Sequence, residues 1–401
     1  MKILRIIARL NVGGPARHVV WLTAALNDAE FQTTLAAGSV PPGEDDMGYF
    51  ARENNVLPVI IPEMSREISL SDVRSLWKIY RLIQTEKPDI IHTHTAKAGT
   101  LGRAAGFLYR WLAVLSRKRK IKFVHTFHGH VFHSYYSPAK TKMFLAIERI
   151  LARAVTDRII VLSEQQREEI SKIFRVGRHD QFAVIPLGID VEKLTPDIAS
   201  RRRLRDELGF GEDVIVVGYV GRLTEIKNLP LLLETAALFG ENSLVKFVIV
   251  GDGHLRSELE SLAASLGLNT EVSFLGSRSD IAELYSAFDI VALTSRNEGT
   301  PLSLIEAMAA GKPVISTGVG GVRDLLGEAE SQDGAVVVCE RGIRIDSCLP
   351  ADFQNGLQYL IQDKEVRSRL AGRGKEFARA SYGKERLIAD IKSLYRSLYT
   401  N

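Results

Sequence analysis

Short apolar runs alternate with longer amphipathic runs along most of the 401-residue chain. Such alternation is typical of parallel sheets that carry helices on both faces. In the first half of the chain we predict strands at 3–7, 33–37, 59–61, 90–92, 122–125, 158–162 and 182–185. In the second half we predict strands at 214–220, 246–250, 272–275, 289–294, 313–317 and 335–338.

The amphipathic runs predict helices at 14–26, 70–85, 97–115 and 140–154, and three more at 350–362, 364–380 and 384–398. A polar segment interrupts the alternation at 188–211, and we interpret its arginines as exposed hinge surface: Arg201, Arg202, Arg203 and Arg205. We therefore expect an α/β chain of two Rossmann-like domains with doubly wound parallel sheets, at 1–190 and 191–383. A last helix at about 384–401 is expected to pack back on the first domain, and the central cleft between the domains is the default active site.

The composition is that of an ordinary globular enzyme, with 45% apolar and 25% charged residues. Cys339 and Cys348 do not make a disulfide framework, so a reducing cytoplasm is the simplest setting. The first ten residues are too short and too rich in arginine for a signal peptide. We find no uninterrupted apolar run long enough to span a membrane.

Positive charge is concentrated in the first domain. Residues 1–190 carry 27 Lys and Arg against 18 Asp and Glu, whereas the remainder carries 25 against 30. An aromatic helix end leads there into a cationic segment that would suit anionic lipid at the inner face of the membrane: Arg110, Trp111, Arg117, Lys118, Arg119 and Lys120. An exposed loop is the alternative, and nucleic-acid binding is disfavoured because no aromatic residues interleave with the charges.

Two carboxylates, Glu298 and Glu306, stand eight positions apart across the start of a short predicted helix. Thr300 could cap that helix, Pro301 suits its first turn, and Gly311 could end it. The preceding strand would put Glu298 at the carboxyl edge of a sheet, where open α/β sheets bind ligands. Because a helix N-terminus between the carboxylates favours phosphate, the layout suits a nucleotide-sugar.

Two further segments suit phosphate. Arg222 and Lys227 lie five positions apart just after the predicted strand 214–220, so both could reach a diphosphate. The alternative is a solvated loop with a salt bridge to Glu225. Gly13 and Gly14 follow the first strand and precede a helix, but they do not form the dinucleotide fingerprint, so a nicotinamide cofactor is disfavoured.

Histidines are concentrated in the first domain, at 92, 94, 125, 128, 130 and 133. Such a cluster could indicate a metal site, but no helix would put the histidines of 125–133 on one face and no acidic residue is near them in the sequence. We expect one or two of them to line the cleft as hydrogen-bonding groups, with no metal.

These motifs together resemble glycosyltransferase family 4, which has the GT-B fold, over nearly the full length. The similar positions occur in family order: Gly13-Gly14, Thr126-Phe127-His128, Gly221-Arg222 with Lys227, Val250-Gly251-Asp252-Gly253, Glu298 and Glu306. The segment 92–103 also resembles bacterial members that build surface polysaccharides.

The resemblance implies roles at the matching positions. Glu298 would bind hydroxyls of the donor sugar, and Glu306 would bind the ribose. The backbone of Gly299, Thr300, Pro301 and Leu302 would lie near the sugar and phosphates, and the Gly13-Gly14 loop would approach the phosphates. Arg222 and Lys227 would neutralise the leaving diphosphate in place of a metal, and His128 would contact the sugar near its C6 hydroxyl. Glu298, His128, Arg222 and Lys227 are thus the expected catalytic residues.

The expected activity is transfer of a hexosyl or N-acetylhexosaminyl group from a nucleotide-diphosphate donor, most simply a UDP-sugar, to a hydroxyl acceptor. The resemblance implies retention of anomeric configuration, no cofactor, and a glycan or lipid-linked intermediate of cell-surface polysaccharide as acceptor. Thr300 stands where the family often has an aromatic residue, which leaves the donor sugar open. Two alternatives remain: a nucleotide-sugar epimerase of the same architecture, and a non-catalytic subunit that binds nucleotide-sugars.

Overall fold

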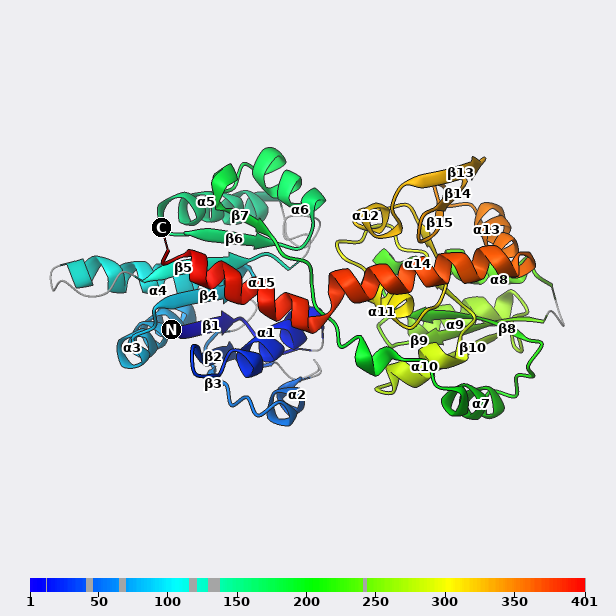
Figure 1. The fold of residues 1–401 in the computed structure, drawn as a ribbon, viewed down its shortest axis with the longest axis horizontal. Helices are drawn as coiled ribbons and strands as arrows, with labels where there is room; N and C mark the ends of the chain where they lie inside the picture. The colour runs from blue at the N-terminus through cyan, green and yellow to red at the C-terminus, as the bar shows by residue number, and fades with distance from the viewer. Residues whose placement is uncertain are drawn as a thin grey trace. The chain divides into compact units, whose positions relative to one another are not determined.

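The computed structural model describes residues 1–11, 13–40, 46–64, 70–114, 121–128, 138–240 and 244–400. The chain divides into two compact units, coloured from one end of the chain to the other in Figure 1. Unit 1 comprises Met1–Gly188 together with Lys384–Asn401, and unit 2 comprises Ile189–Gly383. Among the described helices, none combines the length and apolar composition needed to cross a bilayer.

Unit 1 is built on a seven-stranded sheet in which every pairing is parallel. Its order is β3-β2-β1-β4-β5-β6-β7. The strands are β1 (Lys2–Ile7), β2 (Gln32–Gly38), β3 (Val59–Ile61), β4 (Ile90–His94), β5 (Lys122–Thr126), β6 (Arg158–Val161) and β7 (Phe182–Val184). Each strand predicted for the first half of the chain is confirmed to within two residues.

Helices cover both faces of this sheet. They are α1 (Gly14–Ala25), α2 (Gly48–Glu53), α3 (Ser71–Glu86), α4 (Ala96–Val114), α5 (Pro138–Ala154), α6 (Glu164–Glu168) and, from the chain's end, α15 (Lys384–Ser397). Leu387 and Ile391 of α15 share one buried cluster with Ile3 of β1 and Leu22 of α1. The opposite face packs against α3 and α4, for example through Ile79. The last helix is therefore part of the core of unit 1.

Unit 2 is built on an eight-stranded sheet of order β10-β9-β8-β11-β12-β15-β14-β13. The strands are β8 (Ile215–Val220), β9 (Val245–Val250), β10 (Val272–Gly276), β11 (Ile290–Leu293), β12 (Val314–Thr317), β13 (Ala329–Asp333), β14 (Val336–Cys339) and β15 (Gly342–Ile345). The sheet is parallel from β10 to β15 and antiparallel at the edge formed by β14 and β13. The sequence predicted β14 but missed β13 and β15. All five residues of β13 are exposed, so it lacks the apolar alternation that marks a strand.

The helices of unit 2 are α7 (Ile198–Glu207), α8 (Leu229–Ala237), α9 (Arg256–Ser265), α10 (Ile281–Ala287), α11 (Leu302–Ala309), α12 (Val322–Leu326), α13 (Pro350–Gln362) and α14 (Lys364–Tyr382). Short helical turns precede several of them, including Glu225–Lys227 before α8. The predicted final helices at 350–362 and 364–380 are confirmed by α13 and α14.

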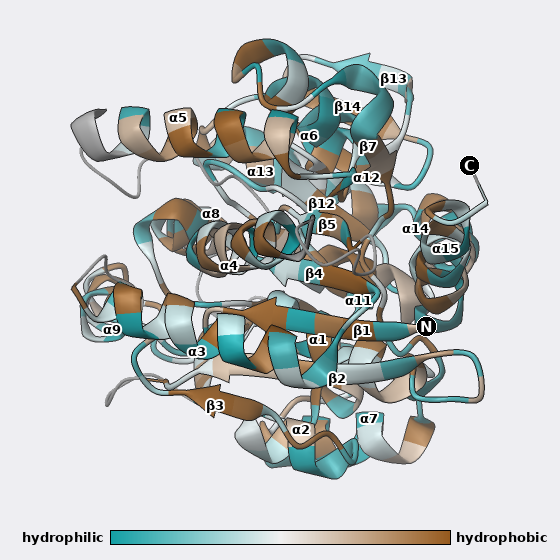
Figure 2. Cartoon of the chain, turned by 90° about the vertical axis from the view of Figure 1, so that its left-hand side faces the viewer, coloured by the Kyte–Doolittle hydropathy of each residue, from teal (hydrophilic) through white to brown (hydrophobic). Residues whose placement is uncertain are grey.

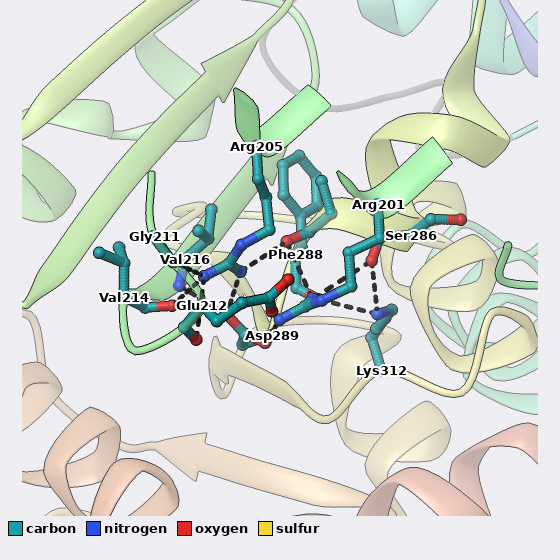
Figure 3. Close-up of polar contacts among 11 residues, drawn as sticks. Arg201, Arg205, Gly211, Glu212, Val214, Val216, Ser286, Phe288, Asp289 and Lys312 are labelled. Carbon is teal, nitrogen blue, oxygen red and sulfur yellow. Dashed lines mark hydrogen bonds and ion pairs between the residues drawn. The ribbon is translucent and has the colours of Figure 1, made fainter. Parts of the chain in front are cut away.

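The interpretation of the 201–205 arginines as hinge surface is wrong for Arg201 and Arg205, which bind Asp289 just before β11 (Figure 3). Asp289 accepts hydrogen bonds from Arg201 at 2.9 Å, from Arg205 at 3.1 Å and from the amide of Val216 at 2.8 Å. Arg205 is buried and also donates to the carbonyl of Gly211 at 2.7 Å. This cluster fastens α7 to the sheet, and its partners lie too far apart in the chain for a local pattern to reveal it.

Candidate functional site

The loops that follow β8 and β11 meet at the carboxyl edge of the unit 2 sheet, because these two parallel strands are neighbours. The loop after β8 carries Arg222 and Lys227, and the loop after β11 carries Glu298. Lys227 Nζ lies 2.5 Å from Glu298 Oε1. Ser295 Oγ donates to the same carboxylate oxygen at 2.6 Å. A cation, a carboxylate and a hydroxyl therefore form one connected group.

Backbone and side-chain hydrogen bonds fix these two loops against each other. The amide of Arg296 donates to the carbonyl of Ile226 at 2.8 Å, and Thr294 Oγ1 donates to the carbonyl of Lys227 at 3.0 Å. The turn at Gly320, after β12, approaches this backbone closely. A Cβ added to Gly320 would lie 2.0 Å from the carbonyl oxygen of Glu298. The main chain at Lys227 and Glu298 is thus held in place.

The cation side of the site is shaped by close backbone approach between β8 and β9. A Cβ on Gly251 would lie 1.9 Å from the carbonyl oxygen of Gly221, so this crossing requires glycine. Arg222 is exposed, and within the described chain no ion pair engages it. The alternative prediction, a salt bridge from this loop to Glu225, is wrong. Glu225 instead lies 2.9 Å from His254, and Lys227 pairs with Glu298.

Helix α11 begins beside Glu298 and carries Glu306. The expectation that Thr300 caps this helix is wrong: the cap position is Pro301, and no side chain caps the helix. Pro301 also has no N–H, so only the other residues expected in this role, Gly299, Thr300 and Leu302, could donate a backbone hydrogen bond to an anion. Gly311 does follow the helix end in the left-handed conformation (φ 67°).

Glu306 is held by a residue that the sequence analysis missed. The hydroxyl of Tyr285, a buried side chain of α10, lies 3.1 Å from Glu306 Oε2 and 2.9 Å from the carbonyl oxygen of Ser303. Nothing in the sequence points to this contact, since Tyr285 precedes Glu306 by 21 residues. The sequence gives a weak indication that Ser295 belongs to the site, because Ser295 follows the predicted strand and stands three residues before Glu298.

In unit 1, histidines gather at the carboxyl ends of β4 and β5. His94 Nδ1 lies 2.9 Å from His128 Nε2. His18, from the helix that follows the Gly13-Gly14 turn, packs edge-on against both rings, with centroids at 5.8 Å and 5.0 Å. Gly13 is the residue before α1 and Gly14 its first residue. His130 and His133 lie outside the described residues.

A buried polar chain continues below this cluster. Arg5 donates to His92 Nδ1 at 3.2 Å, and the hydroxyl of Tyr395 in α15 lies 2.7 Å from the same nitrogen. Since a guanidinium can only donate, His92 Nδ1 carries no proton, and its Nε2–H donates to Thr126 Oγ1 at 2.7 Å. The tautomer of His92 therefore follows from its neighbours.

Burial keeps these imidazoles neutral. It lowers the pKa of His18, His92, His94 and His125 well below the usual range, with smaller contributions from neighbouring positive groups, and it lowers the pKa of His128 to about 3. One side-chain nitrogen from each of His18, His94 and His128 lies within 4.8 Å of the other two, a spacing that could hold a metal ion. The positive charge of Arg5, which also lowers the pKa of His18 and His94, opposes a metal cation. Uncharged hydroxyl groups suit this cluster better.

Comparisons with known proteins give consistent results for both units of the chain. Residues 12–193 match the family model described as Glycosyltransferase Family 4, and residues 200–377 match the model described as Glycosyl transferases group 1. The chain is 35% identical over 274 residues to UDP-Gal:alpha-D-GlcNAc-diphosphoundecaprenol alpha-1,3-galactosyltransferase of Escherichia coli, covering 67% of this chain and 68% of that one. It is 29% identical over 328 residues to the putative glycosyltransferase EpsD of Bacillus subtilis, covering 80% and 81%.

Solved structures show the same fold. Anabaena Alr3699/HepE in complex with UDP superposes with a TM-score of 0.80 at 23% identity, covering 99% of this chain and all of the other. Its complex with UDP-glucose gives a TM-score of 0.77 at 22% identity, with the same coverage. With two Rossmann-like units, both family models and the Escherichia coli relative in agreement, the chain belongs to glycosyltransferase family 4 and is a glycosyltransferase with the GT-B fold.

Proposed function

We propose that this glycosyltransferase uses a UDP-sugar and transfers its sugar, with retention of anomeric configuration, to a hydroxyl of a lipid-linked glycan intermediate in surface polysaccharide synthesis. The observation that carries the donor proposal is the group formed by Lys227, Glu298 and Ser295 at the carboxyl edge of the unit 2 sheet. The similarity to a protein solved with UDP and UDP-glucose supports the nucleotide. The name of the Escherichia coli relative supports both the UDP-sugar and the diphospholipid-linked acceptor.

In this proposal the donor lies along α11. Glu306, with Tyr285 behind it, binds the ribose hydroxyls, and Glu298 binds hydroxyls of the sugar. The diphosphate meets Arg222, Lys227 and the uncapped N-terminus of α11, whose amides and dipole favour an anion. Each of these groups interacts more strongly with a leaving diphosphate as its charge grows, which is the requirement for stabilising the transition state without a metal.

The unit 1 residues contribute neutral groups. We propose that His128 contacts the donor sugar near its C6 hydroxyl and that the Gly13-Gly14 turn approaches the phosphates. His128 Nδ1 is buried and has no hydrogen-bond partner among the described residues, as expected of an atom that forms its hydrogen bond with a ligand hydroxyl. Because burial lowers the pKa of His128 to about 3, it serves as a hydrogen-bonding group and not as a base near neutral pH.

The lipid-linked acceptor requires a surface that meets the membrane, and we propose the end of unit 1 around α3 and α4. Trp111 is 63% exposed and Trp77 is 52% exposed, and Arg81 lies 5.1 Å above the Trp77 ring. Arg110 packs over Phe123 at 5.1 Å. Figure 2 views this end of unit 1 and shows hydrophobic residues on α4. Arg117, Lys118, Arg119 and Lys120, also proposed for this contact, lie outside the described residues.

A panel of UDP-, GDP- and ADP-sugars tests the donor. We expect UDP-sugars to raise the melting temperature most and to be hydrolysed slowly without acceptor, because the free energy of binding adds to that of folding. The anomeric configuration of the released sugar, read by NMR before mutarotation, tests retention. Glu298→Gln and Lys227→Ala should each remove turnover and leave the circular dichroism spectrum unchanged, whereas Glu258→Gln, on exposed α9 surface, should retain it. Stabilisation by no nucleotide, or near-normal turnover by either site variant, would overturn the proposal.

A further inference from the structure

Lys227 and Glu298 bind each other although the proposed function assigns them to different parts of the donor. Their contact is 2.5 Å, and the side chains are only 19% and 9% exposed. The Coulomb attraction between two charges so well shielded from water is stronger than that between two charges on the surface. Without a donor, Lys227, the proposed partner of the diphosphate, is therefore neutralised by Glu298, the proposed partner of the sugar.

We propose that the diphosphate takes Lys227 away from Glu298 during donor binding, so that the nucleotide itself makes Glu298 available to the sugar. This inference rests on the proposed function of the two residues. A diphosphate carries more negative charge than one carboxylate, and exposed Arg222 lies on the same loop to share it. Lysine suits an exchange of partners because its ammonium is a compact charge on a flexible stem.

The backbone limits this exchange to side chains. The two loops are joined by the Arg296 amide bonded to the Ile226 carbonyl at 2.8 Å and by Thr294 Oγ1 bonded to the Lys227 carbonyl at 3.0 Å. The Lys227 ammonium can therefore turn toward a phosphate while its own main chain stays beside β11.

Ser295 is what keeps Glu298 in position after the lysine leaves. Its hydroxyl donates to the same oxygen, Oε1, at 2.6 Å. Ser295 is fully buried, and its carbonyl accepts a hydrogen bond from Thr317 Oγ1 at 2.6 Å, which anchors it to β12. Ser295 is thus a positioning residue: it holds the carboxylate toward the sugar without touching the donor itself.

The exchange predicts an unusual binding pattern that calorimetry can measure with UDP and UDP-glucose. Glu298→Gln removes the competitor for Lys227, so UDP should bind this variant at least about fivefold more tightly than the wild type. UDP-glucose should gain less than UDP, because its sugar loses a charged partner. The gain should disappear in the double variant Glu298→Gln with Lys227→Met. Glu258→Gln should bind UDP as the wild type does.

The Ser295 role has its own measurement in UDP-glucose hydrolysis. Ser295→Ala should raise KM for UDP-glucose and lower kcat while UDP alone binds as in the wild type, and Ser295→Thr, which keeps the hydroxyl, should restore most of both.

The outcomes separate the two proposals. If UDP binds the wild type but binds Glu298→Gln no more tightly, the exchange is refuted and the donor site stands. If Ser295→Ala weakens UDP itself, Ser295 supports the fold and not the carboxylate. If the wild type binds neither UDP nor UDP-glucose, the proposed function fails and the exchange fails with it.

Discussion

The buried histidines of unit 1 should make this half of the chain sensitive to mild acid. His18, His92, His94 and His125 are between 0% and 1% exposed, and burial lowers the pKa of each well below 6.5. In the unfolded chain the same side chains regain water and an ordinary pKa of about 6.5. Below that pH the unfolded state binds more protons than the folded state, so the free energy of unfolding falls as the pH falls.

The size of the effect follows from the number of protons. Between pH 7.5 and pH 5.5, each histidine that titrates only in the unfolded state costs about 1.4 kcal/mol, so these four and His128, whose pKa burial lowers to about 3, together cost about 7 kcal/mol. That is comparable to the whole stability of many domains. Carboxylates are not involved in this window, because ion pairs such as Asp28 with Lys392, which lowers the pKa of Asp28 to about 2, are lost only at lower pH.

Tryptophan fluorescence reports on unit 1 alone, since all three tryptophans, Trp21, Trp77 and Trp111, lie in it. With a slope of about 2 kcal/mol per molar urea, the unfolding midpoint should fall by roughly 3–4 M between pH 7.5 and pH 5.5. His18→Leu should reduce the loss by about one fifth, because it removes one of the five protons. His179→Gln, at an exposed position, is the matched control. A midpoint that does not move between the two pH values would refute the reasoning.

Three further changes test other parts of the structure. Asp289→Asn leaves Arg201 and Arg205 without their carboxylate and should destabilise unit 2 by about 3 kcal/mol in urea followed by circular dichroism; an equal loss in Asp213→Asn, an exposed position, would contradict this explanation. Tyr285→Phe removes the hydroxyl beside Glu306 and should weaken UDP binding roughly fivefold, for about 1 kcal/mol, with kcat little changed; a loss in kcat alone would assign the hydroxyl elsewhere. Trp111→Ser should reduce sedimentation with phosphatidylglycerol vesicles relative to Leu238→Ser, an exposed position of unit 2; equal sedimentation of the two would argue against the membrane surface.

The strands were readable from the sequence because both sheets bury them on two faces, which produces continuous apolar runs such as Ile290–Leu293. The exposed edge strand β13 had no such run and was missed. Glu298, Glu306 and Lys227 were identified as candidates because each stands at a fixed offset from a predicted strand or helix. Their roles toward a donor stay predictions.

The residues that position the site carboxylates and fasten α7 to the sheet could not be predicted from the sequence. Tyr285 reaches Glu306 from another helix, and Arg205 reaches Asp289 across 84 residues. Such contacts depend on how elements pack in three dimensions, and neither the composition nor the periodicity of one segment records them. The arginine-rich segment predicts exposed surface for this reason, since charge alone does not reveal a buried partner.

The position of Tyr395 determines when unit 1 can mature during synthesis. The Tyr395 hydroxyl forms a hydrogen bond with His92 in the middle of the unit 1 sheet, and Leu387 and Ile391 of the same helix belong to the unit 1 core. Although domains generally fold in the order in which they leave the ribosome, the first domain here waits for the last helix. The second domain can finish first. A chain that stops before α15 therefore lacks part of the core of unit 1.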